Sequence, residues 1–152
     1  MLKEDTVSVR PPFVAHRAIR VARVIVSVRT SVEDIHSIEE LCRRSPVGAA
    51  PSTFRDWCRG EGIRAAAALD LARVLRAVHL SRTDGCAPTE CLDADYRTIR
   101  NLIDRGGVSE LLTSRSTTMR QLCTAQRYIR NSTVIREVLQ LWPEDAASRL
   151  TP

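Results

Sequence analysis

Aromatic side chains are scarce in this sequence of 152 residues, and Lys3 is its only lysine. With 4% aromatic residues, a core has to consist mainly of Leu, Ile, Val and Ala, which suits helices packed on helices. No apolar run approaches the roughly 20 residues that span a bilayer. Residues 1–13 also lack the apolar stretch of a secretory signal, so we expect a cytoplasmic protein that does not enter a membrane.

The common catalytic and metal-binding motifs are also missing. The sequence has no Gly-rich phosphate loop, no nucleophile elbow and no run of residues with metal-ligand spacing. Asp93 and Asp95 form a close acidic pair, which we interpret as caps of a helix that begins near Tyr96. We therefore predict no enzymatic activity, no catalytic residue, no metal and no cofactor.

The sequence contains five cysteines, an odd number, at irregular spacings, and no two of them form a C-x-x-C pair. This pattern is typical of buried, reduced thiols in a reducing compartment. A zinc site formed by His79, Cys86 and Cys91 is the less favoured alternative. The five cysteines are Cys42, Cys58, Cys86, Cys91 and Cys123.

The net charge is +5, and almost all of the positive charge belongs to arginine. Codon usage in a GC-rich genome would produce this bias. DNA binding would also favour it, because arginine makes forked contacts with phosphates and guanine edges. The stretches 6–29 and 111–136 contain arginines and no acid, as expected of a phosphate-binding surface or a solvated helix face. In contrast, residues 31–63 contain four arginines and six carboxylates.

Apolar periodicity predicts helices along most of the chain. The β-branched run 24–28 leaves a strand as an alternative at one place. Ser37 and Glu40 form a capping box, and Pro51 suits the first turn of a helix. The predicted helices cover 14–28, 38–44, 51–59, 64–80, 96–105, 109–130 and 132–142, with a single helical turn at 90–94.

Residues 50–63, APSTFRDWCRGEGI, follow the preceding short helix across a turn, which is the pattern of a helix-turn-helix. In that unit apolar residues anchor the second helix, and short polar or Arg side chains face the DNA groove. The expected anchors are Phe54, Trp57 and Cys58 on the second helix and Ile38, Leu41 and Cys42 on the first.

The sequence TIRNLIDRGGV from Thr98 echoes TFRDWCRGEGI from Thr53, with an arginine at the same position and a glycine at the end. The predicted helix 64–80 between the two copies would be roughly 25 Å long at 1.5 Å per residue. A spacer of that length could place two recognition helices about one DNA turn apart, roughly 34 Å.

Two such units joined by one long helix resemble the DNA-binding domain of the AraC/XylS family. In the segment 34–63, SIEELC is similar to the family's scaffold helix and PSTFRDWCR to its first recognition helix. The resemblance extends over roughly 12–108. The second unit, CAPTECLDADYRTIRNLIDRGG, is degenerate, because it lacks the family's Gly-Phe turn and two anchoring phenylalanines.

This resemblance implies an all-α fold of two helix-turn-helix subdomains joined by a long linker helix, plus a C-terminal helical extension. The expected segments are a flexible tail (1–11), a first helix-turn-helix subdomain (12–63), the linker helix (64–80), a degenerate second helix-turn-helix (81–108), the extension (109–142) and a tail (143–152).

The resemblance further implies a sequence-specific transcriptional regulator of double-stranded DNA without its own sensor domain. The helix at 51–59 would read the major groove, and the helix at 96–105 is a candidate for a second groove. The expected DNA-binding residues are Ser52, Thr53, Arg55, Asp56 and Arg59, then Arg97, Arg100 and Asn101, with Arg43 and Arg44 on phosphate.

The alternative function is a protein-interaction module, in which a degenerate AraC-like fold binds a partner protein or a second copy of itself. The final helix is apolar enough to form such an interface, although a place in the core is the commoner role of such a stripe. Its apolar residues are Val134, Ile135, Val138, Leu139, Leu141 and Trp142.

Overall fold

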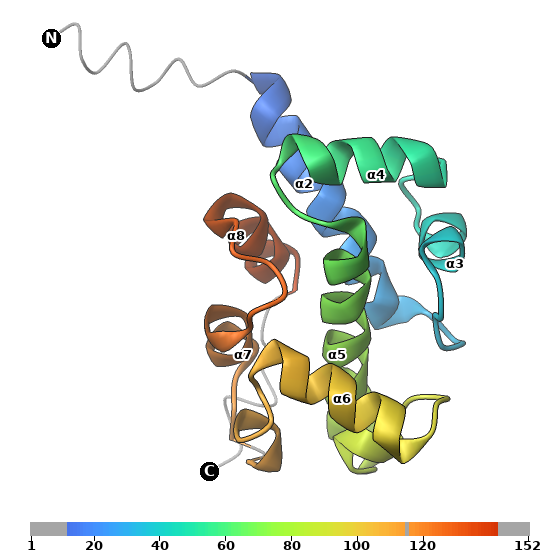
Figure 1. Ribbon diagram of the computed structural model, residues 1–152, viewed down its shortest axis with the longest axis vertical. Coiled ribbons are helices and arrows are strands. Elements are labelled where there is room, and N and C mark those ends of the chain that lie inside the picture. The colour runs from blue at the N-terminus through green and yellow to red at the C-terminus, as the bar shows by residue number, and fades with distance from the viewer. Residues whose placement is uncertain (1–11, 115, 143–152) are drawn as a thin grey trace, which may run out of the picture.

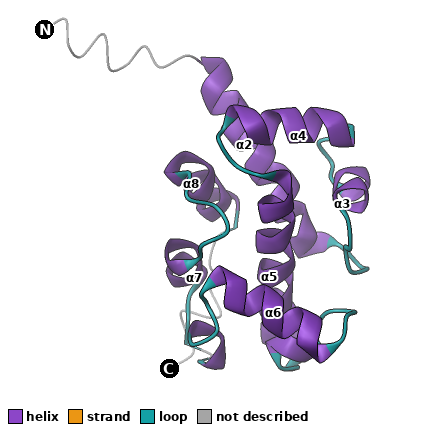
Figure 2. Cartoon of the chain, viewed as in Figure 1, coloured by secondary structure: helices purple, strands orange, loops and turns teal. Residues whose placement is uncertain are grey.

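The computed structural model describes residues 12–114 and 116–142. This part of the chain contains seven α-helices, three short 3-10 helices and no strand, which confirms the all-α prediction (Figure 2). The tails expected at 1–11 and 143–152 lie outside the described residues. The α-helices are α2 (Pro12–Val26), α3 (Ile38–Arg44), α4 (Pro51–Gly60), α5 (Ala65–Asp84), α6 (Tyr96–Gly106), α7 (Met119–Ala125) and α8 (Ser132–Leu141).

Helix α5 runs through the middle of the molecule, and the other helices are arranged around it (Figure 1). Helix α4 lies near its N-terminal end, and α6 crosses it towards its C-terminal end. Helix α2 packs against α4, α5 and α8. Helices α7 and α8 lie along one side of α5 and α3 on the other, so the C-terminal extension is part of the same helical body.

The core forms where α2, α5 and α8 meet, and its composition follows from the shortage of aromatic residues. Small residues one turn apart, Ala18 and Ala22 on α2 and Ala68 and Ala72 on α5, are fully buried and let the helices approach closely. Branched side chains fill the remaining space. Those with no exposed surface include Val21, Val24, Ile25, Leu71, Val134 and Val138.

Local signals fix where several helices begin. Pro51 is the first residue of α4. Asp95 caps α6 by accepting a hydrogen bond from the Thr98 amide at 2.8 Å. The expected capping box of α3 is half formed: the Ser37 hydroxyl accepts from the Glu40 amide at 3.1 Å, whereas the Glu40 carboxylate accepts from the amide of residue 36.

The long helix extends beyond the predicted 64–80. Helix α5 continues for one more turn to Asp84 and ends at Gly85, which adopts the left-handed conformation with φ of 82°. The next helical turn is the 3-10 helix η2 at Pro88–Glu90, slightly earlier than the turn predicted at 90–94. The run 24–28, for which a strand was the alternative, forms the end of α2 and the start of the 3-10 helix η1 (Ser27–Thr30).

The prediction of a helix over 109–130 is wrong for most of that segment. Among the described residues of this segment, only the 3-10 helix η3 (Leu111–Thr113) and the seven-residue α7 are helical. The reason lies in the hydroxyl side chains, which bond to the backbone in place of a continuous helix. The Thr113 hydroxyl donates to the Glu110 carbonyl at 2.7 Å, and the Thr117 hydroxyl donates to the Leu111 carbonyl at 2.7 Å.

One arginine of the described residues lies inside the protein. Arg76 on α5 is 5% exposed and donates to the Ser31 carbonyl at 2.7 Å. Its Nε lies 3.5 Å from a carboxylate oxygen of Asp34, which is also buried. Arg76 therefore fastens the connection between α2 and α3 to the central helix and is not available to a ligand.

Candidate nucleic-acid interface

All the DNA-binding residues predicted on helix α4 are exposed to solvent, because the apolar residues of this helix point into the core. Phe54 and Cys58, four residues apart, are fully buried. Trp57 is half-buried, and the guanidinium carbon of Arg20 on α2 lies 5.4 Å from the centre of its ring. The exposed residues of α4 include Ser52, Thr53, Arg55, Asp56 and Arg59.

Both arginines on this face of α4 are paired with nearby acids. An Nη of Arg55 lies 3.1 Å from Glu39 on α3, and an Nη of Arg59 lies 2.8 Å from Asp56 on α4 itself. A backbone hydrogen bond and the Arg55 guanidinium lower the pKa of Glu39. Exposed pairs of this kind are weak and are screened by salt, so a phosphate or base edge can compete for each arginine.

A basic hollow of about 780 Å³ adjoins α4. Thr53 and Trp57 line one side of it, and Arg20 and Arg23 of α2 line another. Arg23 is exposed and has no acidic partner among the described residues. Helix α2 thus adds positive charge beside α4, on a segment where the sequence analysis noted arginines without acids.

The two arginines predicted to contact phosphate from α3 are both exposed but differ in their surroundings. An Nη of Arg44 lies 2.8 Å from Glu33, and hydrogen bonding to Arg44 lowers the pKa of that carboxyl. Within the described chain, Arg43 has no acidic partner. Arg43 is therefore the more available of the two for an anion.

Helix α6 holds the second predicted group, and again all of its members are exposed: Arg97, Arg100 and Asn101. Arg100 donates to the Tyr96 hydroxyl at 2.9 Å, and its Nε lies 3.7 Å from Asp104. The opposite face of α6 is buried through Ile99, Leu102 and Ile103.

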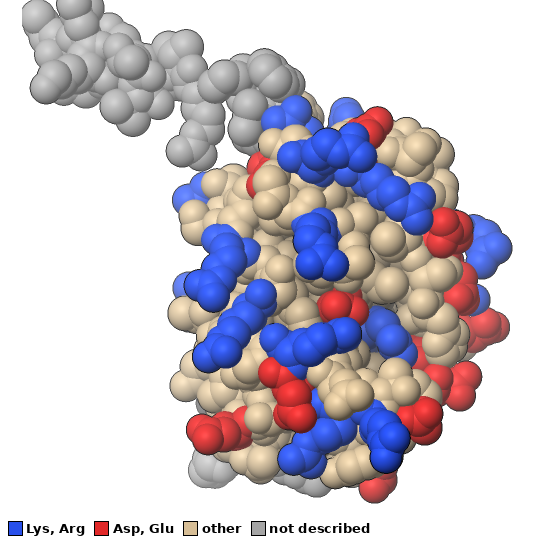
Figure 3. Space-filling model, viewed as in Figure 1, with Lys and Arg blue, Asp and Glu red and all other residues tan. Residues whose placement is uncertain are grey.

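These groups belong to a face of the molecule that is rich in arginine. Figure 1 shows α4 and α6 on the same side of the molecule, near opposite ends of α5. Figure 3 shows arginine side chains spread over this face from top to bottom. Many acidic side chains lie along the edge where α3 lies, and others lie among the arginines in the middle and lower part of the face. Of the acids that make 31–63 negative overall, Asp56 lies on the exposed face of α4, and Glu39 lies beside Arg55 of that face.

The segment 126–131, hereafter the α7–α8 turn, is tied to the C-terminal ends of both α4 and α6. The amide of Arg127 donates to the Gly106 carbonyl at 2.9 Å, and the Tyr128 hydroxyl donates to a carbonyl within α6. The Asn131 side-chain amide donates to the Glu61 carbonyl at 2.7 Å, just after α4. No local sequence signal indicated these contacts, because they join residues far apart in the chain.

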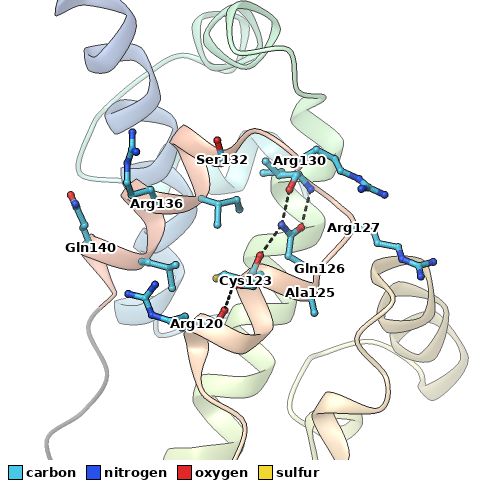
Figure 4. Close-up of a pocket in the computed structure, with 13 residues that line it drawn as sticks. Arg120, Cys123, Ala125, Gln126, Arg127, Arg130, Ser132, Arg136 and Gln140 are labelled. Carbon is cyan, nitrogen blue, oxygen red and sulfur yellow. Dashed lines mark hydrogen bonds between the residues drawn. The ribbon is translucent and has the colours of Figure 1, made fainter. Parts of the chain in front are cut away.

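The α7–α8 turn is itself held in one conformation by Gln126, a buried polar residue. Its side-chain amide donates to the carbonyls of Cys123 and Ile129, at 3.2 and 2.6 Å, and its carbonyl accepts from the Ile129 amide at 2.9 Å (Figure 4). A groove of about 1060 Å³ lies along α7, this turn and α8. The arginines that line the groove are Arg120, Arg127, Arg130 and Arg136.

The prediction of five reduced thiols is wrong for two of the cysteines. Cys86 and Cys91 form a disulfide that encloses the 3-10 helix η2. Their sulfurs are therefore not available as thiolates for the zinc site considered with His79. Cys42, Cys58 and Cys123 are thiols outside this disulfide and are buried, as predicted. No group of three or more potential metal ligands occurs within 12–114 and 116–142.

The apolar stripe of α8 is largely used within the chain. Val134, Val138 and Trp142 are buried, and the Trp142 ring meets His79 edge-on at 5.7 Å between centroids. Ile135, Leu139 and Leu141 are half-buried. Core packing, weighed above against a partner interface, is thus the role of the first three residues.

Over the described residues, no helix is both long and apolar enough to cross a membrane. Comparison of the chain with protein-family models, with curated protein sequences and with solved structures gives no match.

Proposed function

We propose that the chain is a sequence-specific DNA-binding transcriptional regulator of AraC/XylS type, acting in the cytoplasm. In this proposal, α3 with α4 forms the first helix-turn-helix, α5 is the linker helix, and the region ending in α6 is a degenerate second unit. Helix α4 enters one major groove, and α6 is a candidate for the next. The base-facing residues are Ser52, Thr53, Arg55 and Arg59 on α4 and Arg97, Arg100 and Asn101 on α6.

The observation that supports this proposal best is the placement of α4 and α6. Each is a short helix with one buried face and one polar, arginine-bearing face, and they lie on the same side of the molecule near opposite ends of α5. The 20 residues of α5 correspond to about 30 Å at 1.5 Å per residue. Successive major grooves on one side of DNA are about 34 Å apart, so the spacing suits two adjacent grooves.

Two ion pairs on α4 have to break before the proposed DNA contacts can form. Arg55 has to leave Glu39, and Arg59 has to leave Asp56, before either guanidinium can reach a base or a phosphate. Because these ion pairs are exposed, breaking them costs little free energy, so DNA phosphates can compete with the carboxylates for the arginines. Arg43 needs no such exchange, which suits a phosphate contact.

The test is selection of preferred duplexes from a random pool by the intact protein, repeated with Arg55→Ala. We expect the variant to lose about 1–3 kcal/mol on the preferred site and to relax the preference at one base pair. Arg43→Ala is the matched control, and it should weaken binding equally on all sequences. If Arg55→Ala has no effect, or weakens all sequences equally, α4 does not read bases as proposed.

A further inference from the structure

We propose that Arg127 and Arg130, on the α7–α8 turn, bind the phosphate backbone of DNA between the two grooves assigned to α4 and α6. The inference rests on the proposed DNA-binding function and adds a phosphate site outside both helices. Nothing in the AraC/XylS resemblance covers this segment, since that resemblance ends near residue 108.

The first support is the position of the turn. Through Asn131 it is bonded to the residue that follows α4, and through Arg127 and Tyr128 it is bonded to the end of α6. It therefore bridges the C-terminal ends of the two helices. A duplex that places successive major grooves on α4 and α6 has to pass its intervening backbone over the region between those ends.

The second support is the rigidity of the two arginine positions. Gln126 bonds to three backbone groups around the turn, so the chain at Arg127 and Arg130 is well fixed. The Arg127 side chain lies directly over the backbone of Gly107, where an added Cβ would come within 2.9 Å of its Nε. A fixed backbone lowers the entropy cost of ordering these side chains on a phosphate.

The third support is charge. Arg127 and Arg130 are both exposed, and in the described chain neither has an acidic partner. The charges of Asp70 and Asp104 act on Tyr128 in this turn, and each of these carboxylates is paired with an arginine of α6. Asp70 lies 3.4 Å from Arg105, and Asp104 lies 3.7 Å from Arg100. The two arginines of the turn are thus free to take phosphates, which guanidinium groups bind with forked geometry.

A second pair of arginines, Arg120 on α7 and Arg136 on α8, provides a matched control. Figure 4 shows Arg127 and Arg130 extending to one side of these two helices, whereas Arg120, Arg136 and Gln140 extend to the other. Arg120 and Arg136 are also exposed and also lack acidic partners among the described residues. Removing either pair lowers the net charge by the same amount, so a difference between the pairs reports position and not charge.

The experiment measures the affinity of the intact protein for a random-sequence duplex at several salt concentrations by fluorescence anisotropy. It compares wild type, Arg127→Gln/Arg130→Gln and Arg120→Gln/Arg136→Gln. Loss of two phosphate contacts should make the slope of log K against log salt shallower by about 2 and reduce affinity roughly 10- to 100-fold near 0.1 M salt. We expect this for the first pair only, with base preferences unchanged in selection.

Three results would overturn the proposal, and they separate it from the function on which it rests. If wild type binds and Arg127→Gln/Arg130→Gln has the wild-type slope, or if both double variants change the slope equally, the site is wrong and the DNA-binding function stands. If folded wild type does not bind duplex at low salt, both fail. Thermal unfolding followed by circular dichroism confirms that each variant is folded.

Discussion

At the scale of single residues, pairing decides which arginines can meet a ligand. Arg76 is buried beside Asp34 and serves the fold. Arg55 is exposed but held by Glu39, so its availability depends on competition and on salt. Arg43 is exposed without an acidic partner among the described residues. Sequence composition counts all three alike, and only their surroundings separate structural from ligand-binding roles.

The cysteines give a prediction at this scale. Burial raises the pKa of the Cys58 thiol to about 12 and also raises the pKa of Cys42, so the reactive thiolate is disfavoured in the folded protein at pH 8. We expect folded, unreduced protein to react slowly with a thiol reagent at pH 8, because Cys86 and Cys91 are in a disulfide.

After mild reduction, two thiols should react quickly at pH 8 and the remaining three only after denaturation. Counting the labelled cysteines by mass spectrometry at each stage checks this. Rapid labelling of all five cysteines in folded, reduced protein would contradict the observed burial of Cys42, Cys58 and Cys123.

At the scale of elements, the end of α6 is a docking point for the α7–α8 turn. A Cβ added at Gly106 would overlap the ring of Tyr128, whose hydroxyl is bonded to a carbonyl of α6. Glycine at this position therefore allows the turn to approach the helix. Burial raises the pKa of the Tyr128 hydroxyl, which keeps it protonated as a hydrogen-bond donor.

We expect Gly106→Ala to lower the free energy of unfolding by about 1–3 kcal/mol, the usual cost of overpacking. Gly60→Ala, at the end of α4, is the comparison: its added Cβ would lie 2.7 Å from Nε of Arg17, a long side chain that can shift more readily than the ring of Tyr128 although it is paired with Glu61 at 2.9 Å. Chemical denaturation of both variants measures the difference. Equal effects of the two substitutions would show that Tyr128 does not pack against Gly106.

The sequence predicted elements best where the signal is local. The Ala- and Leu-rich pattern of α5, the proline at the start of α4 and the cap at Asp95 all depend on neighbouring residues, and these helices form as predicted apart from shifted ends. Residues 109–118 contain only two apolar residues, Leu111 and Leu112, and hydroxyl groups of this segment bond to the backbone and interrupt the helix predicted there.

The candidate site, too, was predictable from the sequence only where it depends on local patterns. The exposed faces of α4 and α6 follow from helical periodicity, so the predicted residues reach the surface as expected. The contact between Asn131 and the Glu61 carbonyl joins positions 70 residues apart, and the ion pair of Arg55 with Glu39 spans two helices. Such contacts depend on tertiary packing, which no local pattern records.

At the scale of the whole molecule, the C-terminal extension completes the core. Helix α8 packs along α2, and its Val134 and Val138 are buried together with Trp142, the residue that follows the helix. Since the α7–α8 turn also reaches α4 and α6, the extension fixes the relative positions of the two candidate recognition helices.

We therefore expect Trp142→Ala to destabilise the fold by about 3–5 kcal/mol, through the cavity that it leaves, without changing the oligomeric state. Gln140→Ala, an exposed position on the same helix, should change stability by less than about 0.5 kcal/mol. Denaturant unfolding and sedimentation together test this. Loss of an oligomer in Trp142→Ala, at unchanged stability, would instead assign this residue to an interface between chains.

The central claim is that the arginine-rich face bearing α4 and α6 binds DNA. The most direct measurement is a fluorescence anisotropy titration of the intact protein against a random-sequence duplex at several salt concentrations. We predict binding at low salt, with log K falling steeply and linearly against log salt, as several phosphate contacts require. Absence of binding at low salt, from protein shown by circular dichroism to be folded and helical, would contradict the claim.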